Sequence, residues 1–392
     1  MSESSQINIY GAVTQRPGDS CDFNIKQNIR QSIDRILFRL TPKNTIDYRN
    51  YLNSGVYNLG DHAIALAAAQ QVNSVAKHID VNLVDWGALE SATRSTPTLI
   101  AGSGYFFIEP SKSPAARIEL DSQYLLKNSI AHAFHGVGVN YVSSGRRLTL
   151  GDIPEEGQKL LSRSLAKARA ISVRDATSKS ILQPLTDTNV IITGDPALFI
   201  KSDTANHRLN PAIGTSLTIG INIPFHGPAA SARVSKDLKS YIQFFKALQK
   251  KTNCQFIQTI HFHSEIVIGK ILQDHGIPLI QAIGGVQTLL SAYQQMDFHI
   301  GGMLHSCILS ASTGTPCIGL AYDIKHQGFF DLLGQPDLCV PAEPFDPERL
   351  SATCDHVLTH ADTIRKQINA RRDELELTSN QFLAQTLQAL LS

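Results

Sequence analysis

Short apolar segments alternate with longer amphipathic ones through most of this chain. Apolar runs of roughly four to eight residues recur at 81–86, 98–104 and 170–175, and a helix-like segment lies at 159–168. The same alternation restarts at residue 217 and continues to residue 322. Short strands that alternate with helices favour a parallel sheet covered by helices on both faces. The sequence therefore predicts an α/β protein with two doubly wound, Rossmann-like domains facing a cleft.

The chain has 392 residues, too many for one ordinary hydrophobic core. Isoleucines and leucines at helical spacing between residues 26 and 40 indicate a helix ahead of the alternation, and a polar stretch at 201–216 is expected to be a linker. The expected parts are an N-terminal helical appendage (1–43), an N-terminal Rossmann-like domain (44–205), a C-terminal Rossmann-like domain (206–345) and C-terminal helices that brace the N-terminal domain (346–392).

Charge and cysteine content limit the function classes. Thirty-five Lys and Arg residues against 34 Asp and Glu give a formal net charge of +1, which provides no field for attracting nucleic acid. The six cysteines form no CxxC pair, so neither a zinc site nor a disulfide framework is expected. We find no signal-peptide pattern and no apolar run near the roughly 20 residues of a membrane helix. A cytoplasmic protein without a membrane span is expected, with peripheral contact to a membrane-borne substrate left open.

Two facing sheets place a ligand cleft at the carboxyl ends of their strands, so loops that follow strands are the places to look for a site. Asn58, Gly60 and Asp61 stand where such a loop opens a helix. The backbone N–H groups of a helix start can hold an anion, and the two polar side chains can bind a sugar hydroxyl. The alternative is that Asp61 only caps the helix.

Two glycine-rich turns, AGSG (101–104) and GVGVN (136–140), also follow predicted strands. Glycine allows a backbone to turn sharply or to approach a ligand closely, and Ser103 and Asn140 are the polar side chains of these turns. Neither turn has the GxGxxG spacing of a dinucleotide-binding loop. The two turns are therefore expected either to face a ligand at the carboxyl edge of the sheet or to serve only as turns between strands and helices.

Arg174 ends a short apolar strand, where a solvated arginine is less expected. Its planar, forked donor set suits a carboxylate or a phosphate bound in the cleft. The alternative is an ion pair with the adjacent Asp175 or another nearby aspartate.

Residues 301–330 form the densest candidate segment, comprising a loop, a helix and a strand. His305 is expected in the first turn of the helix at the carboxyl edge of the sheet, where an imidazole suits proton transfer near neutral pH. Lys325 follows the next strand, where its ammonium could reach a phosphate or a developing oxyanion. A structural histidine and a surface lysine are the respective alternatives.

Taken in order, these segments resemble the polysaccharide pyruvyl transferase family. The motifs that carry the likeness are NLGDHAI, AGSG, GVGVN, ISVRDATS, GDPAL, IGINI and GGMLHSCILSASTGTPCIGLAYDIK, which together span roughly residues 45–334. The resemblance implies two domains arranged similarly to the glycosyltransferase-B fold. It also implies a transferase of polysaccharide and exopolysaccharide biosynthesis, which would move the pyruvyl group of phosphoenolpyruvate onto a sugar of a cell-surface polysaccharide precursor as a ketal.

Under this resemblance phosphoenolpyruvate is the donor substrate, the acceptor is a sugar or a lipid-linked saccharide, and neither a cofactor nor a metal is required. His305 would be the catalytic acid/base, with Arg174 and Lys325 binding the donor. The expected substrate-binding positions also include Asn58, Gly60, Asp61, Ser103, Asn140 and Met303. Histidine pairs at 132/135 and at 261/263 indicate no third ligand, so a metal site is not expected there.

Met303 departs from the family pattern, because the family usually has arginine at this position. A thioether cannot replace a guanidinium as an anion ligand. The alternatives are a nucleotide-sugar-dependent glycosyltransferase, a diverged homologue with another donor, or a non-catalytic ligand-binding homologue. The sequence leaves open the acceptor sugar, the ketal positions, the surface that meets a lipid carrier and the oligomeric state.

Overall fold

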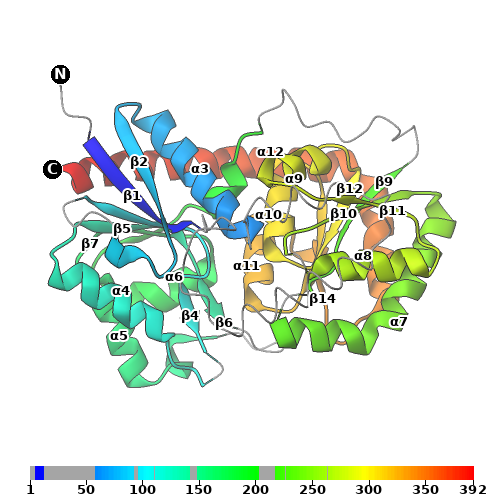
Figure 1. Cartoon of the computed structure of the whole chain (residues 1–392), viewed down its shortest axis with the longest axis horizontal. Helices are drawn as coiled ribbons and strands as arrows, with labels where there is room; N and C mark the ends of the chain where they lie inside the picture. The colour runs from blue at the N-terminus through cyan, green and yellow to red at the C-terminus, as the bar shows by residue number, and fades with distance from the viewer. Residues whose placement is uncertain are drawn as a thin grey trace.

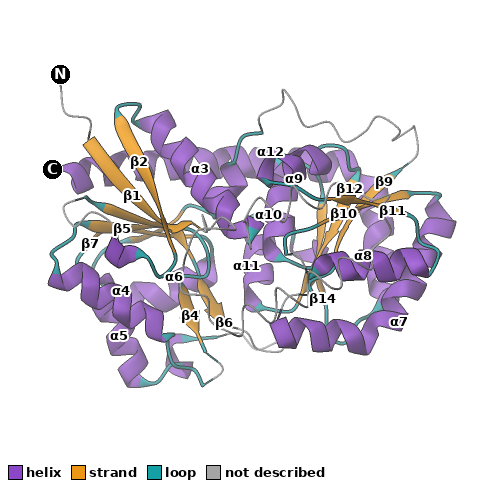
Figure 2. Cartoon of the chain, viewed as in Figure 1, coloured by secondary structure: helices purple, strands orange, loops and turns teal. Residues whose placement is uncertain are grey.

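The computed structural model describes residues 5–12, 58–91, 96–109, 111–141, 148–202, 217–225, 227–262 and 264–392. These residues form two α/β domains, and one long C-terminal helix runs along both (Figures 1 and 2). Among the described helices, none combines the length and the apolar character needed to cross a bilayer.

The N-terminal domain is built on a parallel sheet of order β2-β1-β3-β5-β7-β8. Its strands are β1 (Ser5–Ala12), β2 (Ile79–Asp85), β3 (Thr98–Ala101), β5 (His132–Val137), β7 (Ala168–Val173) and β8 (Val190–Ile192). A small parallel pair, β4 (Phe106–Ile108) and β6 (Val139–Tyr141), lies beside it. The helices are α3 (Leu59–Val75), α4 (Ala116–Lys127), α5 (Glu155–Leu165), α6 (Ala176–Leu182) and the short 3₁₀ segment η4 (Pro196–Phe199).

The C-terminal domain repeats the arrangement with a parallel sheet of order β11-β10-β9-β12-β13-β14. Its strands are β9 (Thr218–Asn222), β10 (Gln255–Thr259), β11 (Leu279–Ala282), β12 (Phe298–Gly301), β13 (Cys317–Ala321) and β14 (Cys339–Pro341). Its helices are α7 (Gly227–Thr252), α8 (Glu265–Asp274), α9 (Val286–Tyr293), α10 (Leu304–Ser312) and α11 (Ile324–Leu332). The predicted two-domain α/β architecture is therefore confirmed.

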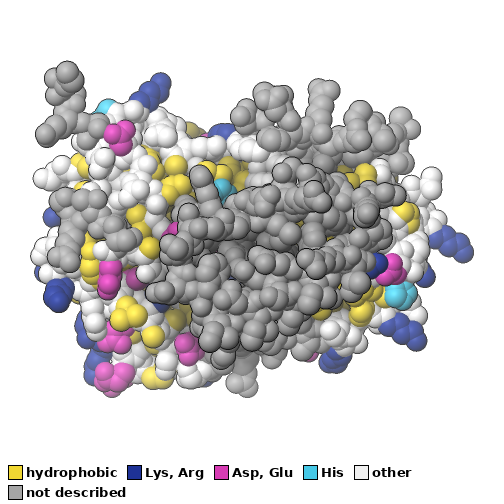
Figure 3. All heavy atoms as spheres, viewed as in Figure 1, with side chains coloured by type: hydrophobic (Ala, Val, Ile, Leu, Met, Phe, Trp, Pro, Cys, Tyr) yellow, Lys and Arg dark blue, Asp and Glu magenta, His cyan; other side chains and the backbone are white. Residues whose placement is uncertain are grey.

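Strand alternation divides the core of the N-terminal domain between the two faces of its sheet. Ile7 and Ile9 of β1 pack in the same cluster as Ala63 and Ala67 of α3, whereas Tyr10 packs in the cluster that includes α4 and α5. The small residues of α3 let the helix approach the sheet closely. On the face drawn in Figure 3, acidic and basic side chains are interspersed along the lower left edge, where Figure 1 places α4 and α5.

The expectation of a helical appendage at residues 1–43 is wrong for residues 5–12. These residues form β1, which lies between the edge strand β2 and β3 and pairs with both. The polar Asn8 suggests a surface segment, but it is buried: its amide donates to the carbonyl of Thr96 and its oxygen accepts from Asn82. The predicted helix at 26–40, the loop at 53–57 and most of the linker at 201–216 lie outside the described residues.

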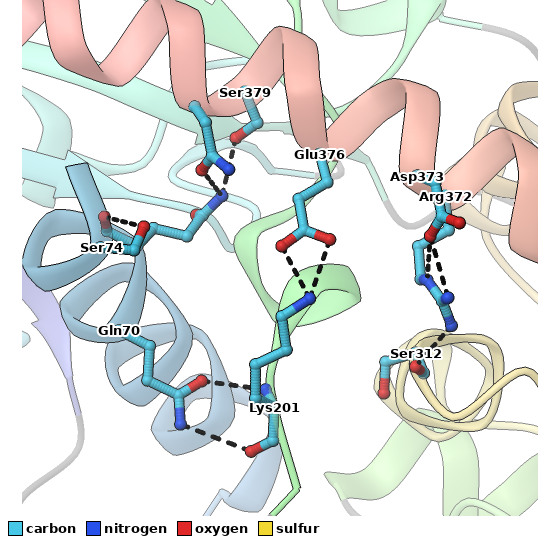
Figure 4. Close-up of polar contacts among 10 residues, drawn as sticks. Gln70, Ser74, Lys201, Ser312, Arg372, Asp373, Glu376 and Ser379 are labelled. Carbon is cyan, nitrogen blue, oxygen red and sulfur yellow. Dashed lines mark hydrogen bonds and ion pairs between the residues drawn. The ribbon is translucent and has the colours of Figure 1, made fainter.

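The C-terminal helix α12 (Pro347–Leu391) is kinked at His360 and contacts both domains. It packs on α7 and α10 of the C-terminal domain and on α3, β5 and β7 of the N-terminal domain. Figure 4 shows the polar contacts: Arg372 donates to the carbonyl of Ser312 in the C-terminal domain, while Ser379 accepts from Gln71 of α3. Lys201, which follows η4, pairs with Glu376 at 2.7 Å. This helix thus connects the two halves of the molecule.

Candidate active site

The start of α3 supplies the first group of site residues. Asn58 caps the helix, because its Oδ1 accepts from the backbone N–H groups of Gly60 (3.0 Å) and Asp61 (3.4 Å). Its Nδ2 donates to Asp61 Oδ2 at 2.8 Å. Asn58, and not Asp61, is therefore the cap. Burial, followed by the nearby carboxylate of Asp195, raises the pKa of Asp61 to about 6.

Asp195 caps the N-terminus of η4 and directly follows the left-handed Gly194, in the short turn after β8. Its Oδ1 accepts from the N–H of Ala197 at 3.0 Å, which fixes the orientation of the carboxyl group. The side chain is 3% exposed. Burial raises the pKa of Asp195 to about 6, against a smaller opposing effect of the Arg174 guanidinium.

Arg174 and Asp175 follow β7 and form a buried ion pair. Arg174 Nε donates to Asp175 Oδ2 at 3.2 Å, and the two side chains are 5% and 4% exposed. Gly138 leaves room for the guanidinium, since a Cβ there would lie 2.7 Å from Arg174 Nη2. Asp175 Oδ1 also caps α6 by accepting from Ser178 N–H at 2.7 Å. The ion pair foreseen as the structural alternative is therefore present.

His305 comes from the opposite domain, in the first turn of α10. The start of this helix is held by Asn222 at the end of β9, whose Oδ1 accepts from the N–H of Met303 at 2.9 Å. The imidazole packs directly against α3, because a Cβ on Gly60 would lie 2.8 Å from His305 Cβ and closer still to the ring. The site is thus closed across the domain boundary.

Burial, followed by the positive charge of Arg174, holds the pKa of His305 well below its usual range. His261, Lys325 and His326 act in the same direction. The imidazole is therefore neutral at physiological pH in this closed form. Its Nε2 lies 4.0 Å from Asp195 Oδ2, and neither atom has a hydrogen-bond partner among the residues that the structure describes.

Lys325 lies in the first turn of α11, 16% exposed, and pairs with Asp323 at 3.6 Å. Its ammonium is 5.3 Å from the centre of the Tyr322 ring, and the guanidinium of Arg233 is 5.1 Å from the same ring. The Tyr322 hydroxyl in turn reaches the sulfur of Met303 at 3.7 Å. Two cations therefore flank the tyrosine that contacts the substituted position.

A cavity of about 10 Å³, room for about one water, lies between the two domains. Its polar lining comes from Arg174, Asp175 and Asp195 on one side and Lys325 on the other. The remaining lining is apolar and is formed by Leu304, Ile308 and Phe329. The buried Arg174 and the partly buried Lys325 thus face a shared space beside His305.

The structure brings together some of the predicted site residues and separates others. His305 lies against Gly60, and Arg174 and Lys325 share the cavity. Ser103 and Asn140 are absent from the described lining of that cavity, but the backbone N–H of Ser103 hydrogen-bonds the Asp195 carboxyl group. Ser103 has φ of 61°, a conformation that favours glycine, and its carbonyl accepts from Gly138 N–H at 2.8 Å. Asn140 lies on β6 beside Gly104.

Sequence reasoning gave no site role to Asp195, Asn222 or Arg233. Asp195 had a usable signal, because GDPAL places a carboxylate directly after a strand. Asn222 likewise stands at the end of a predicted strand in the motif IGINI, whereas Arg233 had no comparable signal. No set of three or more His, Cys, Asp or Glu side chains within the described ranges could hold a metal ion. Of the histidines considered as ligands, His135 contacts Gln71 at 3.1 Å and His132 contacts the carbonyl of Ile130 at 3.0 Å, while His263 lies outside the described residues.

The family model of polysaccharide pyruvyl transferases matches residues 58–324, which is more than half of the chain. The chain belongs to the polysaccharide pyruvyl transferase family. It is therefore a transferase by family, and the matched range contains His305, Arg174 and Asp195. The amylovoran biosynthesis protein AmsJ of Erwinia amylovora is 26% identical over 91 residues, which cover 23% of this chain and 22% of that protein. The match thus spans about a fifth of the relative's length.

Solved structures share the architecture at low sequence identity. The MnaA protein of S. aureus with UDP and a putative UDP-N-acetylglucosamine 2-epimerase from Listeria monocytogenes are each 10% identical to this chain, with a TM-score of 0.50. Both matches cover 93% of this chain and 90% of the other. They support the predicted glycosyltransferase-B-like arrangement of two Rossmann-like domains, and nothing about the ligand.

Proposed function

We propose that this chain transfers the pyruvyl group of phosphoenolpyruvate to two hydroxyls of a saccharide in the cytoplasm. The methylene carbon of phosphoenolpyruvate takes up one proton, and a first hydroxyl adds to the adjacent carbon. A second hydroxyl then displaces the phosphate at that carbon. The two hydroxyl protons balance the new methyl group and the released hydrogen phosphate, so the products are a ketal and phosphate.

One observation carries this proposal: Arg174 and Lys325, from opposite domains, line the same buried space beside His305. Phosphoenolpyruvate carries a carboxylate and a phosphate, and each anionic group requires a cation when it is removed from water. The guanidinium fork suits a planar carboxylate or a phosphate edge, and the ammonium suits a point contact. His305 is the titratable group placed to move the proton.

The donor has to enter before the site closes, because a cavity of about 10 Å³ is far smaller than phosphoenolpyruvate. We propose that α10 and α11 move away from the N-terminal domain to admit the donor and return when it is bound. Closure would then exclude water from the cationic intermediate. The anion would also raise the pKa of His305, which Arg174 and Lys325 lower in the closed form described above.

The position of Met303 is compatible with this donor if another cation takes over the role of the family's arginine. Arg233 is the candidate, since it lies over the ring of Tyr322, whose hydroxyl contacts Met303. Arg233 is 15% exposed and pairs with Glu343 at 3.1 Å. We propose that it helps to hold the negative charge of the donor in the open site.

Titration calorimetry with phosphoenolpyruvate and with a UDP-sugar tests the donor. Binding of phosphoenolpyruvate and no binding of the nucleotide sugar are expected, together with a rise in melting temperature at saturating phosphoenolpyruvate. Arg174→Lys keeps the charge but loses the fork, so at least about a tenfold loss of affinity is expected. The matched exchange Arg163→Lys, on the exposed face of α5, should leave affinity unchanged.

Phosphate release and the new ketal methyl signal, measured with saccharide acceptors, test the reaction. His305→Ala should lower turnover by about 10²- to 10⁴-fold while the protein remains folded. The same exchange at the exposed His78 is the control. Binding of a nucleotide sugar without binding of phosphoenolpyruvate would show that the donor belongs to another class.

A further inference from the structure

The boundary between the domains contains a carboxyl group whose free oxygen faces the ring of His305. Asp195 Oδ1 is occupied by the N–H of Ala197, so the carboxyl group is fixed with Oδ2 toward the site. The separation of 4.0 Å from Oδ2 to His305 Nε2 exceeds hydrogen-bond length by about 1 Å. Both atoms are buried and have no partner within the described part of the chain. A buried donor and a buried acceptor left in this way are rare, and each calls for an explanation.

Asp195 also lines the cavity that Arg174 and Lys325 share. Asp195 therefore adjoins both the imidazole, at 4.0 Å, and the space where the donor would bind. The carboxyl group comes from the N-terminal domain, after β8, and the imidazole comes from α10 of the C-terminal domain. The two groups can meet only when the domains are closed.

We propose that Asp195 and His305 form an acid/base dyad that shares one proton and is assembled from the two domains on closure. In one form the carboxylic acid faces a neutral imidazole. In the other, the proton has moved from Oδ2 to Nε2, giving a carboxylate beside an imidazolium. No proton is gained or lost in this step, and the sum of the two charges stays zero. Asp195 would thus fix which ring nitrogen of His305 carries hydrogen.

The charged surroundings are compatible with a shared proton. Arg174 from the end of β7, Lys325 and His326 from α11, and His261 after β10 all disfavour the imidazolium. Burial, followed by Asp175 among its neighbours, raises the pKa of Asp195 to about 6, although Arg174 opposes this. The Asp195 carboxyl group is therefore partly protonated near pH 6, and its titration is coupled to that of His305.

Asp195→Asn is the decisive variant, because asparagine caps a helix as well as aspartate and keeps the bond to Ala197. Turnover should fall by about 10²-fold or more, while affinity for phosphoenolpyruvate changes by less than about threefold. The acidic limb of the pH–rate profile should disappear. Asp195→Asn/His305→Gln should be no slower than the slower single variant, because the residues act as one unit. The dyad would be overturned if the double variant lost turnover by the product of the two single losses. An unchanged pH–rate profile in Asp195→Asn would also overturn it.

These rate measurements rest on the proposed function, so a readout without substrate is also needed. The ring ¹⁵N shifts of His305, assigned by comparison with His305→Gln, report which nitrogen is protonated. In the unaltered protein Nε2 should carry hydrogen at pH 8, and the shifts should change as Asp195 titrates near pH 6. Asp195→Asn should abolish both features. Shifts that ignore Asp195 would overturn the dyad even if phosphoenolpyruvate were the donor.

The control is Asp346→Asn, the same exchange at the exposed cap of α12, which accepts from Glu348 and Arg349. It should leave turnover, the pH profile and the His305 shifts unchanged. A failure to bind phosphoenolpyruvate, with normal ¹⁵N behaviour, would refute the proposed donor and leave the dyad intact.

Discussion

The two domains bring opposite kinds of titratable group to their shared boundary. The N-terminal domain contributes carboxyl groups, and burial raises the pKa of both Asp61 and Asp195 to about 6. The C-terminal domain contributes imidazoles, and burial lowers the pKa of both His261 and His326 to about 3 and that of His305 well below its usual range. Low polarity favours the uncharged form of an acid and of a base alike.

This difference explains why the site needs both halves. In each domain, burial favours the uncharged form of the carboxyl groups or imidazoles described above. Arg174 and Lys325 provide positive charge on either side of the cavity. A bound anion would complement those cations and make protonation of the nearby histidine easier. Under the proposed function, the cations on either side of the cavity would hold the anionic donor, and the donor would in turn favour proton transfer at His305.

The largest expected difference between the buried histidines and the buried carboxyl groups is their effect on stability at acid pH. Burial lowers the pKa to about 3 in three histidines of the C-terminal domain, His261, His299 and His326. In the unfolded chain the same histidines have a pKa of about 6.5. As pH falls below 6.5, the unfolded chain therefore binds protons that the native protein does not bind, and the native protein loses stability. Each of these histidines costs about 2 kcal/mol at pH 5 relative to pH 7. Asp61 and Asp195 act oppositely, because their raised pKa values make ionisation in the native protein unfavourable. Each therefore adds about 1 kcal/mol to the free energy of unfolding between pH 7 and pH 5.

Urea unfolding at pH 7 and pH 5 measures this balance, and a net loss of several kcal/mol at pH 5 is expected from these groups. His299→Phe should reduce the loss by about 2 kcal/mol. The same exchange at the exposed His78 should not. A loss that stays equal in both variants would mean that the C-terminal histidines do not cause it.

The next effect tests how closely the domains must approach. Gly60→Ala places a methyl group against the His305 ring, so either the imidazole rotates or the domains stay apart. About a 100-fold loss of turnover is expected, equal to about 2.7 kcal/mol. Helix α3 itself should be more stable, because alanine is the better helix former by about 1 kcal/mol.

The clash of the new methyl group with His305 opposes that gain, so both turnover and melting temperature should fall in Gly60→Ala. Gly151→Ala is a suitable control, since a Cβ there would meet its nearest neighbour at 3.9 Å. Full activity in Gly60→Ala would show that the contact between α3 and His305 is unnecessary for the reaction.

The fold could be predicted because each strand and helix has its own local signal. Parallel strands buried on both faces appear as apolar runs, which is why β3, β7, β9 and β13 were predicted close to their observed bounds. Strand β1, the second strand of its sheet, was missed, and its buried Asn8 is satisfied by Asn82 of β2 and by the carbonyl of Thr96. A single sequence contains no record of such partners.

The candidate site was predicted less completely for the same reason. His305, Arg174 and Lys325 could be named because each follows a strand or starts a helix at the carboxyl edge of a sheet. The 4.0 Å approach of Asp195 to His305 depends on closure of two domains whose residues lie 110 positions apart in the chain (305 − 195). The proximity of Arg233 to the Met303 position likewise depends on the Tyr322 ring between them.

A smaller effect is expected when the C-terminal side regains the family's arginine. Met303→Arg adds a forked donor at the start of α10, beside Tyr322 and close to His305. If phosphoenolpyruvate is the donor, its affinity should rise about tenfold, equal to about 1.4 kcal/mol. Calorimetry on Met303→Arg, with Met303→Leu as the uncharged control, measures the change. Equal affinity in both variants would indicate that Arg233 already provides the missing charge or that the anion binds elsewhere.

The smallest effect concerns the ion pair between Lys201, which follows η4, and Glu376 of α12. Lys201→Met removes the pair with Glu376 of α12, in which the two side chains are 66% and 22% exposed. Exposed pairs contribute little, so unfolding free energy should fall by less than about 1 kcal/mol and turnover should stay within about twofold. Lys251→Met is the matched control, because its pair with Asp355 joins α7 to α12 within the C-terminal half. If Lys201→Met slowed turnover tenfold while Lys251→Met did not, the packing of α12 on the N-terminal domain would control domain closure. Turnover would then depend on this packing as well as on the titratable groups at the domain boundary.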